Sequence, residues 1–204
     1  NSPRNTNVRR RRQRQIGIRD SAGKSQVRIA GCLPPLRESY QTNEQEFNSM
    51  TEEYTEIANF LAPGVDLFLC ETMSSATEAA AAAKAASAFG KPVWVSWTLR
   101  DEADGLLRSG ETIDDALASL DKTPIEAVLL NCCDVNAVEN AMTTLRAKTT
   151  HLIGAYANAF TPINKDWKRD GDHLRELQDL TPEVYADQVL QWCATVSYTH
   201  LTRQ

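Results

Sequence analysis

Short apolar runs alternate along most of the chain with segments whose apolar residues follow helical spacing. Five of these runs have the near-continuous apolar character of strands that are covered on both faces. They are residues 27–32, 66–70, 92–98, 127–131 and 151–156. Helical spacing, caps or alanine-rich composition mark the segments 43–61, 75–89, 113–120, 135–148 and 181–193. The pattern therefore predicts a repeating strand–helix unit.

The predicted helices carry recognisable boundary signals. Ser75 and Glu78 match a capping box at the start of the alanine-rich segment, and Gly90 follows its end. Thr181 precedes Pro182, which takes the first helical position that proline favours. These signals place turns between strands and helices, as a repeating unit requires.

Strands joined by helical crossovers predict an α/β fold with a parallel sheet. Two architectures fit this order, a doubly wound open sheet and part of an eight-stranded (β/α)8 TIM-type barrel. Periodicity alone does not choose between them. Both architectures bind ligands at the carboxyl ends of the strands, so the functional residues are expected there.

Composition and cysteine content narrow the class of protein. The chain has 204 residues, of which 42% are hydrophobic and 24% charged, the mix of an ordinary globular domain. It contains no apolar run of about 18 residues, so no membrane-spanning helix is expected. Its five cysteines form no C-x-x-C pair and follow no secretory signal. We therefore expect reduced thiols and a cytoplasmic protein.

The net charge of −5 hides a strong asymmetry. Residues 1–28 hold nine Lys and Arg against one acid, a net of 9 − 1 = +8, so the rest carries −5 − 8 = −13. We predict that residues 1–20 are a disordered basic arm, either simply solvated or able to bind nucleic acid or direct targeting. The acidic body has no basic stripe interleaved with aromatic residues, which argues against a nucleic-acid enzyme.

The predicted strand ends carry the residues whose side chains could take part in catalysis or ligand binding. In chain order they are Cys32, Glu71-Thr72, Ser96, Asn131-Cys132-Cys133 and Tyr156-Ala157-Asn158. A carboxylate, an amide and a thiol that lie together at one edge of the sheet can bind an amino acid, and they can also bind a sulfur-containing group or a soft metal ion. Phosphate-cradling glycine motifs and the G-x-S-x-G nucleophile motif are absent from the sequence.

Each of these residues also has a structural interpretation. Glu71 follows an apolar strand and is expected to be functional, although it could instead cap the next helix. Side chains alternate along an extended segment, so Cys132 and Cys133 should point in opposite directions, with only one easily facing the site. Cys32 fits either a site role or packing. A further set is predicted to serve packing or stability rather than chemistry: Cys70, Cys193 and His151.

The strand ends, taken in order, form a recognisable series of motifs. The pieces are 27–36 (VRIAGCLPPL), 66–72 (DLFLCET), 92–96 (PVWVS), 104–112, 131–132 (NC), 156–158 (YAN) and 180–192. Together they resemble the homocysteine S-methyltransferase family over roughly residues 20–195. The resemblance implies a (β/α) barrel that transfers a methyl group to the thiol of L-homocysteine and forms methionine. It also implies S-methylmethionine or S-adenosylmethionine as the donor, with betaine or a cobalamin-bound methyl group in other members.

The resemblance assigns roles to individual residues. Cys132 corresponds to one of three thiolate ligands of a catalytic zinc ion, and Glu71 to the carboxylate that holds the homocysteine amino group. Thr72 and Asn131 are implied neighbours in the same substrate pocket. Cys133 does not match a ligand position. Homocysteine and a methyl donor are thus the expected partners, without nucleic acid or a membrane.

Departures from the family pattern limit this expectation. The other two zinc ligands belong to a Gly-Gly-Cys-Cys motif that this sequence lacks, and Cys193 comes too early to replace it. The family's first two strands are also missing upstream. We therefore expect residues 21–195 to form an incomplete barrel of about five to six βα units, followed by a non-native tail at 196–204. The chain alone is expected to be inactive.

Two other classes of function stay open at this stage. One is a metal-independent barrel lyase or aldolase in which Glu71 acts as a general base. The other is a non-enzymatic remnant whose basic arm contacts an anionic partner.

Overall fold

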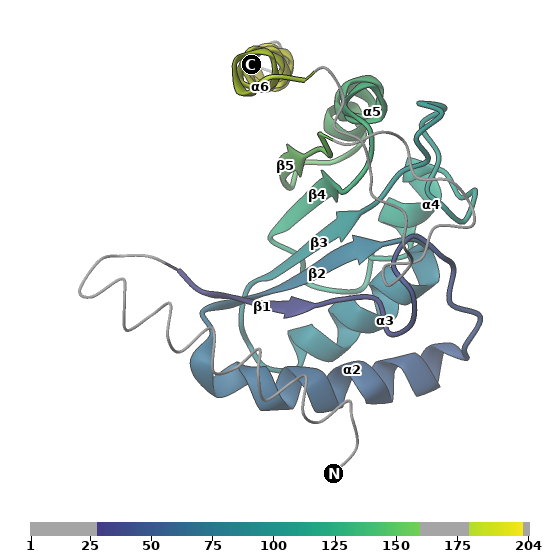
Figure 1. Cartoon of the computed structure of the whole chain (residues 1–204). Helices are drawn as coiled ribbons and strands as arrows, with labels where there is room; N and C mark the ends of the chain where they lie inside the picture. The colour runs from purple at the N-terminus through teal and green to yellow at the C-terminus, as the bar shows by residue number, and fades with distance from the viewer. Residues whose placement is uncertain (1–27, 160–179, 202–204) are drawn as a thin grey trace.

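The computed structural model describes residues 28–159 and 180–201, and it contains one parallel β-sheet. The strands follow chain order: β1 (Ala30–Leu33), β2 (Leu67–Met73), β3 (Val93–Trp97), β4 (Ala127–Asn131) and β5 (Leu152–Tyr156). All four neighbouring pairs are parallel. The sheet is open in this part of the chain, with β1 and β5 at its edges (Figure 1). The predicted α/β class is confirmed, and the open sheet agrees with an incomplete barrel.

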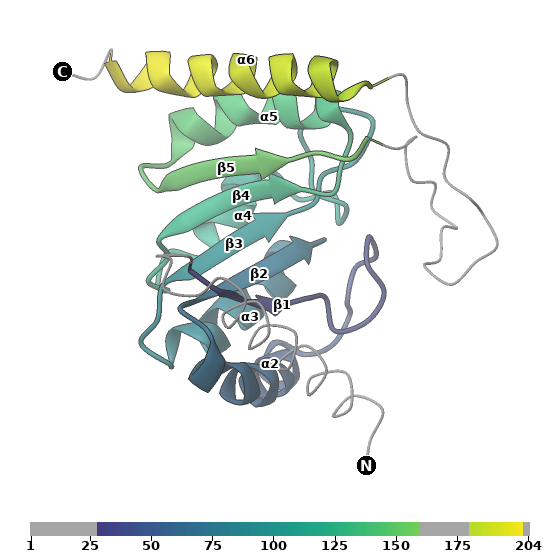
Figure 2. The same cartoon turned by 60° about the vertical axis from the view of Figure 1, so that its left-hand side comes forward.

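Helices cover one face of this sheet (Figures 1 and 2). They are α2 (Phe47–Leu61), the short 3-10 helix η1 (Ala62–Gly64), α3 (Ala76–Ser87), α4 (Ile113–Ala118) and α5 (Val135–Lys148). The last helix of the described residues is α6 (Pro182–Leu201). Helix α6 lies along α5 rather than on the sheet (Figure 2). The opposite face of the sheet has no helix from the described residues over it. This bare face corresponds to the interior side of a (β/α) barrel.

Several helix ends follow from local chemistry, and two differ from the prediction. The Ser75 hydroxyl accepts from the Glu78 backbone N–H at 3.2 Å, but the Glu78 side chain makes no reciprocal cap. Gly90, three residues after the last residue of α3, takes a positive φ of 64°, the conformation that favours glycine. Helix α6 continues to Leu201 instead of ending near Cys193. Residues 194–201 contain neither glycine nor proline, so nothing in the sequence stops that helix.

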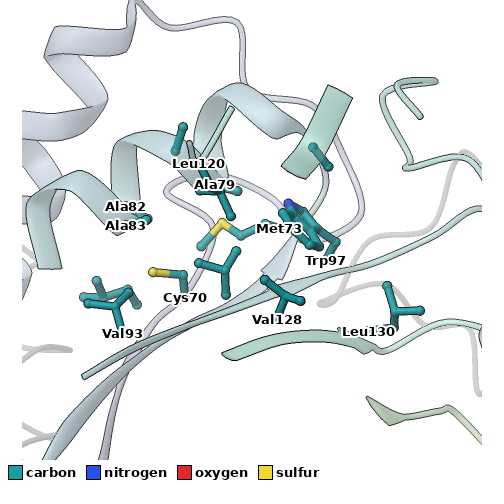
Figure 3. Packing of buried hydrophobic residues seen from close by; sticks show 14 of the residues in the cluster. Cys70, Met73, Ala79, Ala82, Ala83, Val93, Trp97, Leu120, Val128 and Leu130 are labelled. Carbon is teal, nitrogen blue, oxygen red and sulfur yellow. The ribbon is translucent and has the colours of Figure 1, made fainter. Parts of the chain in front are cut away.

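The hydrophobic core lies between the sheet and helices α2, α3, α4 and α5. Figure 3 shows part of it. Helix α3 contributes a run of buried alanines, whose small side chains let it approach β2 and β3 closely. Strand residues Val95, Trp97 and Val128 fill the space opposite, and each is fully buried. Cys70 is also fully buried, and this burial raises the pKa of its thiol. The predicted packing role of Cys70 is confirmed.

Strand register separates core residues from those on the bare face. Leu33, Cys70 and Val95 are neighbours across β1, β2 and β3, and all are fully buried against the helices. The preceding row, Cys32, Leu69 and Trp94, is only partly buried. Successive side chains alternate between faces, so this second row lies on the helix-free side. Glu71 continues the row beyond Leu69, which brings it to the carboxyl edge of that side.

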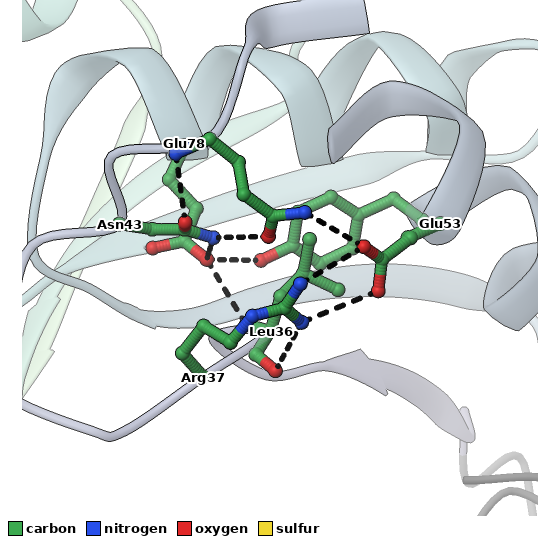
Figure 4. Close-up of polar contacts among 7 residues, drawn as sticks. Leu36, Arg37, Asn43, Glu53 and Glu78 are labelled. Carbon is green, nitrogen blue, oxygen red and sulfur yellow. Dashed lines mark hydrogen bonds and ion pairs between the residues drawn. The ribbon is translucent and has the colours of Figure 1, made fainter. Parts of the chain in front are cut away.

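A buried glutamate fastens the segment after β1 to helix α3 (Figure 4). The Glu78 side chain is fully buried, and its Oε1 accepts from the Leu36 backbone N–H at 3.0 Å. The same oxygen accepts from Asn43 Nδ2 at 3.2 Å and from the Tyr54 hydroxyl at 3.1 Å. Burial, followed by the proximity of Glu78, raises the pKa of Tyr54. Glu78 therefore ties three segments together at the rim next to the carboxyl edge of β1.

Candidate active site at the carboxyl edge of the sheet

Side chains from the ends of all five strands meet in one hydrogen-bonded network at the carboxyl edge. The network consists of Cys32, Glu71, Thr72, Ser96, Asn131, Cys132 and Tyr156. All four residues predicted for the site, Glu71, Thr72, Asn131 and Cys132, belong to it. In parallel α/β folds this edge is where ligands bind.

Asn131 is the centre of this network. Its side chain is fully buried, and its Oδ1 accepts from the Ser96 hydroxyl at 2.5 Å and from the Thr72 backbone N–H at 3.2 Å. Its Nδ2 lies 2.8 Å from Thr72 Oγ1, 3.1 Å from Cys132 Sγ and 2.9 Å from the Tyr156 hydroxyl oxygen. These contacts fix the orientation of the amide. Its N–H group is therefore aimed at the sulfur of Cys132 and at the phenol of Tyr156.

The Cys132 sulfur receives donors from two strands. Besides Asn131 Nδ2, the Thr72 hydroxyl approaches the sulfur at 3.6 Å. The Cys132 backbone is held as well, since its N–H donates to the Tyr156 carbonyl at 3.1 Å and its carbonyl accepts from Thr98 Oγ1 at 3.2 Å. Two converging donors suit a sulfur that carries negative charge.

Two of these residues have an unusual backbone conformation. Thr72 has a φ of 61° and Cys132 a φ of 56°, in the left-handed region that residues other than glycine rarely adopt. Strand β2 shows a register irregularity between Cys70 and Met73, the stretch that contains Thr72. Such conformations cost about 1–3 kcal/mol each and are found most often at functional sites. Here both belong to residues whose side chains contact each other.

Glu71 lies at the other end of the network. Its Oε2 accepts from the Cys32 thiol at 2.8 Å, and its Oε1 accepts from the Tyr156 hydroxyl. Tyr156 in turn accepts from Asn131, so the chain of contacts runs from Cys132 to Glu71. Burial, followed by the hydrogen bond to Glu71, raises the pKa of Tyr156, so its phenol stays protonated near neutral pH. Glu71 does not cap helix α3, because Ser75 takes that position.

Three members of the network were not among the residues selected from the sequence. Cys32 fitted either of two roles, and the structure places it in contact with Glu71. Ser96 and Tyr156 stood near the ends of predicted strands, within the motif pieces 92–96 and 156–158, but neither was given a role. The signal that could have identified them is their position, since each follows an apolar strand at the same edge of the sheet.

The remaining cysteines lie away from the network. Cys133 is fully buried in the core, while Cys132 is partly exposed, so the two point in different directions as predicted. Burial raises the pKa of the Cys133 thiol to about 12. Cys193 is exposed, which corrects its predicted packing role. Its neighbour Trp192 makes the buried contact instead and is 4% exposed.

These burial differences predict a clear order of thiol reactivity. In the native chain, iodoacetamide should modify Cys193 and Cys132, whereas Cys70 and Cys133 should react at least about 100-fold more slowly, since burial keeps them as thiols. Mass spectrometry of the digested protein would measure each rate, and labelling in denaturant would serve as the control. Equal native rates for Cys132 and Cys133 would contradict the placement of these two side chains.

Comparison with known proteins identifies the family. The family model for homocysteine S-methyltransferase matches residues 6–199. The chain belongs to the homocysteine S-methyltransferase family. A curated member from Escherichia coli (strain K12), homocysteine S-methyltransferase, is 25% identical over 191 residues, covering 86% of this chain. The chain spans 60% of the length of that relative.

Solved structures of this family show the same architecture. The apo form of the homocysteine methyltransferase MmuM from Escherichia coli matches with a TM-score of 0.58 and 25% identity, over 74% of this chain and 56% of that one. The metallated form matches with a TM-score of 0.58 and 24% identity, over 74% and 55% respectively. The fold expected from the resemblance is therefore shown.

The described residues do not complete a metal site of the kind expected for this family. Cys132 presents one thiol to the network, but no group of three His, Cys, Asp or Glu side chains able to hold a metal ion occurs within residues 28–159 and 180–201. A catalytic zinc ion takes three protein ligands. The described part of the chain therefore does not fit zinc on its own.

No helix among the described residues has the length and apolar character needed to cross a bilayer. The predicted basic arm at residues 1–20 lies outside the described part of the chain.

Proposed function

We propose that this protein transfers a methyl group to the thiol of L-homocysteine, forming methionine. Family membership supports the reaction class. One structural observation carries the proposal: a thiol, Cys132, and a carboxylate, Glu71, belong to a single network at the carboxyl edge of the sheet. A site for an amino acid with a terminal thiol needs both a group for the ammonium and a polar environment for sulfur.

Glu71 is the proposed partner of the substrate ammonium. An ionised carboxylate binds an ammonium group through a charge-assisted hydrogen bond. Among the described residues, no Lys or Arg forms an ion pair with Glu71, so its charge is available to a ligand. The neutral donors Cys32 and Tyr156 hold its two oxygens in place.

The other end of the network is proposed to receive the substrate sulfur. A free thiol has a pKa near 8.5, so only a few per cent is thiolate at neutral pH and the nucleophile has to be generated in the site. The hydroxyl of Thr72 and the amide of Asn131 already converge on a sulfur atom. In the reaction, the substrate thiol releases its proton to solvent. Its sulfur forms a bond to the methyl carbon while the bond from that carbon to the donor sulfur breaks. The sulfonium donor leaves as a neutral thioether.

The methyl donor and the metal belong to the finer part of this proposal. We propose S-methylmethionine or S-adenosylmethionine as the donor. We also propose that Cys132 is one zinc ligand, binding the ion together with the two cysteines of a Gly-Gly-Cys-Cys motif that these 204 residues lack. The 204 residues alone should accordingly hold zinc weakly and turn over slowly.

The test compares this chain with a longer form that completes the barrel. Methionine formation from L-homocysteine would be measured by mass spectrometry with each donor in parallel, and bound zinc by elemental analysis. We expect turnover and about one zinc per protein in the longer form, and at least about 100-fold less turnover in the 204-residue chain, because a lost metal ligand removes nucleophile activation. Absence of turnover with every donor in a zinc-loaded longer form would overturn the proposed function. Stoichiometric zinc and turnover in the 204-residue chain would overturn the proposed need for outside ligands.

A further inference from the structure

Tyr156 links the two ends of the candidate site. It is the last residue of β5, the edge strand, and its hydroxyl donates to Glu71 Oε1. The same oxygen accepts from Asn131 Nδ2 at 2.9 Å. One hydroxyl is therefore shared between the amide that contacts Cys132 and the carboxylate of Glu71. Motif matching alone did not select this residue for a role.

The hydrogen bonds of Glu71 leave room for a cationic ligand. Each carboxylate oxygen can accept two hydrogen bonds, and the structure gives one donor to each, Cys32 to Oε2 and Tyr156 to Oε1. Both donors are neutral groups. A partly buried carboxylate without a charged partner is energetically costly, and a ligand cation would relieve that cost.

We propose that Tyr156 is a positioning residue that holds Glu71 for the substrate ammonium and thereby selects thiols that are amino acids. This inference rests on the proposed function, because it assumes that homocysteine occupies this site. Tyr156 occupies one lone pair of Oε1 and anchors the carboxylate to Asn131, the fixed centre of the network. The remaining acceptor positions are left for an ammonium group. A thiol without an amino group would gain nothing from this arrangement.

The experiment compares two thiols on three forms of the chain. L-homocysteine and 4-mercaptobutanoate, which lacks only the amino group, would be titrated into the 204-residue chain and followed by NMR, which measures weak affinities. Tyr156→Phe removes the shared hydroxyl. Tyr185→Phe is the matched control, since among the described residues its hydroxyl bonds only to the backbone of Ala157, 2.9 Å from the nitrogen and 3.4 Å from the carbonyl oxygen, and lies outside the network. The 13C signal of the Glu71 carboxyl carbon, assigned with Glu71→Gln, reports on the carboxylate without any ligand.

Tyr156→Phe should weaken homocysteine binding about tenfold, the effect of losing one charge-assisted hydrogen bond, and change 4-mercaptobutanoate binding less than about twofold. The Glu71 carboxyl signal should shift in Tyr156→Phe and stay in place in Tyr185→Phe. An equal loss for both thiols, or an unmoved Glu71 signal, would overturn the positioning role while leaving the proposed function intact. If the unchanged chain binds neither thiol, the proposed site for homocysteine is wrong in this chain, and the inference falls with it.

Discussion

Glu78→Ala should lower the free energy of unfolding by about 3 kcal/mol, because it removes the shared acceptor of a buried polar cluster. Glu78 Oε1 serves the Leu36 N–H, the Asn43 amide and the Tyr54 hydroxyl (Figure 4). The substitution would leave donors without a partner next to a new cavity. Urea denaturation followed by circular dichroism would measure the change. Since a domain of this size is stable by about 5–15 kcal/mol, the loss is large.

Two further variants distinguish the stability contributed by the buried hydrogen bonds of Glu78 from the stability contributed by a neighbouring surface contact. Glu78→Gln keeps an oxygen acceptor of the same shape, so it should cost clearly less than the alanine variant. Glu53→Ala removes the Arg37–Glu53 ion pair at the partly exposed side of the same cluster, a contact of 3.1 Å, together with the hydrogen bond from Gln45 Nε2 at 2.9 Å. It should cost less than about 1 kcal/mol. Equal losses in Glu78→Ala and Glu53→Ala would show that the buried carboxyl has no special part in holding the segment after β1.

The architecture could be predicted from the sequence because its signals are local and repeated. Apolar runs, caps and glycines mark each strand and helix, and β4 and α5 have the predicted bounds, 127–131 and 135–148. The end of α6 was missed because no breaking residue follows Cys193, so the sequence holds no stop signal at that point. The role of Glu78 was missed for a different reason. Its capping pattern suggested a local contact, whereas its partners lie 24 to 42 residues away.

The site could be predicted where the resemblance assigned a role to a residue, and it could not where a role depends on spatial contacts alone. Glu71 and Asn131-Cys132 stand in motifs, and the structure joins them in one network. The contacts made by Cys32 and Tyr156 depend on how strands β1, β2 and β5 are placed side by side in space, over separations of 39 and 85 residues from Glu71. The positive φ of Thr72 and Cys132 is equally invisible in the sequence, because neither residue type signals it. The complete site therefore depends on contacts between strand ends that are far apart in the sequence, which local sequence patterns do not predict.

Cys132→Ala should lower the rate of methyl transfer at least about 100-fold, which is the effect expected for removing a metal ligand. The same substitution should also remove bound zinc. The measurement belongs in the longer form that completes the barrel, where turnover and metal content can both be followed. Cys132 is partly exposed at the network, and the Asn131 amide and the Thr72 hydroxyl are directed at its sulfur. Alanine leaves both donors in place without the sulfur. The loss should therefore affect chemistry and metal binding more than stability.

Cys133→Ala is the matched control, since it removes the adjacent sulfur from the core instead of the site. Cys133 is fully buried among core residues, and the substitution should lower stability by about 1 kcal/mol through a small cavity. Turnover and zinc content should stay within about threefold of the unchanged protein, because packing defects of this size leave the fold intact. If both variants lose zinc and turnover equally, the direction in which the side chains of Cys132 and Cys133 point does not decide function. If only Cys133→Ala loses them, the roles assigned to the pair are reversed.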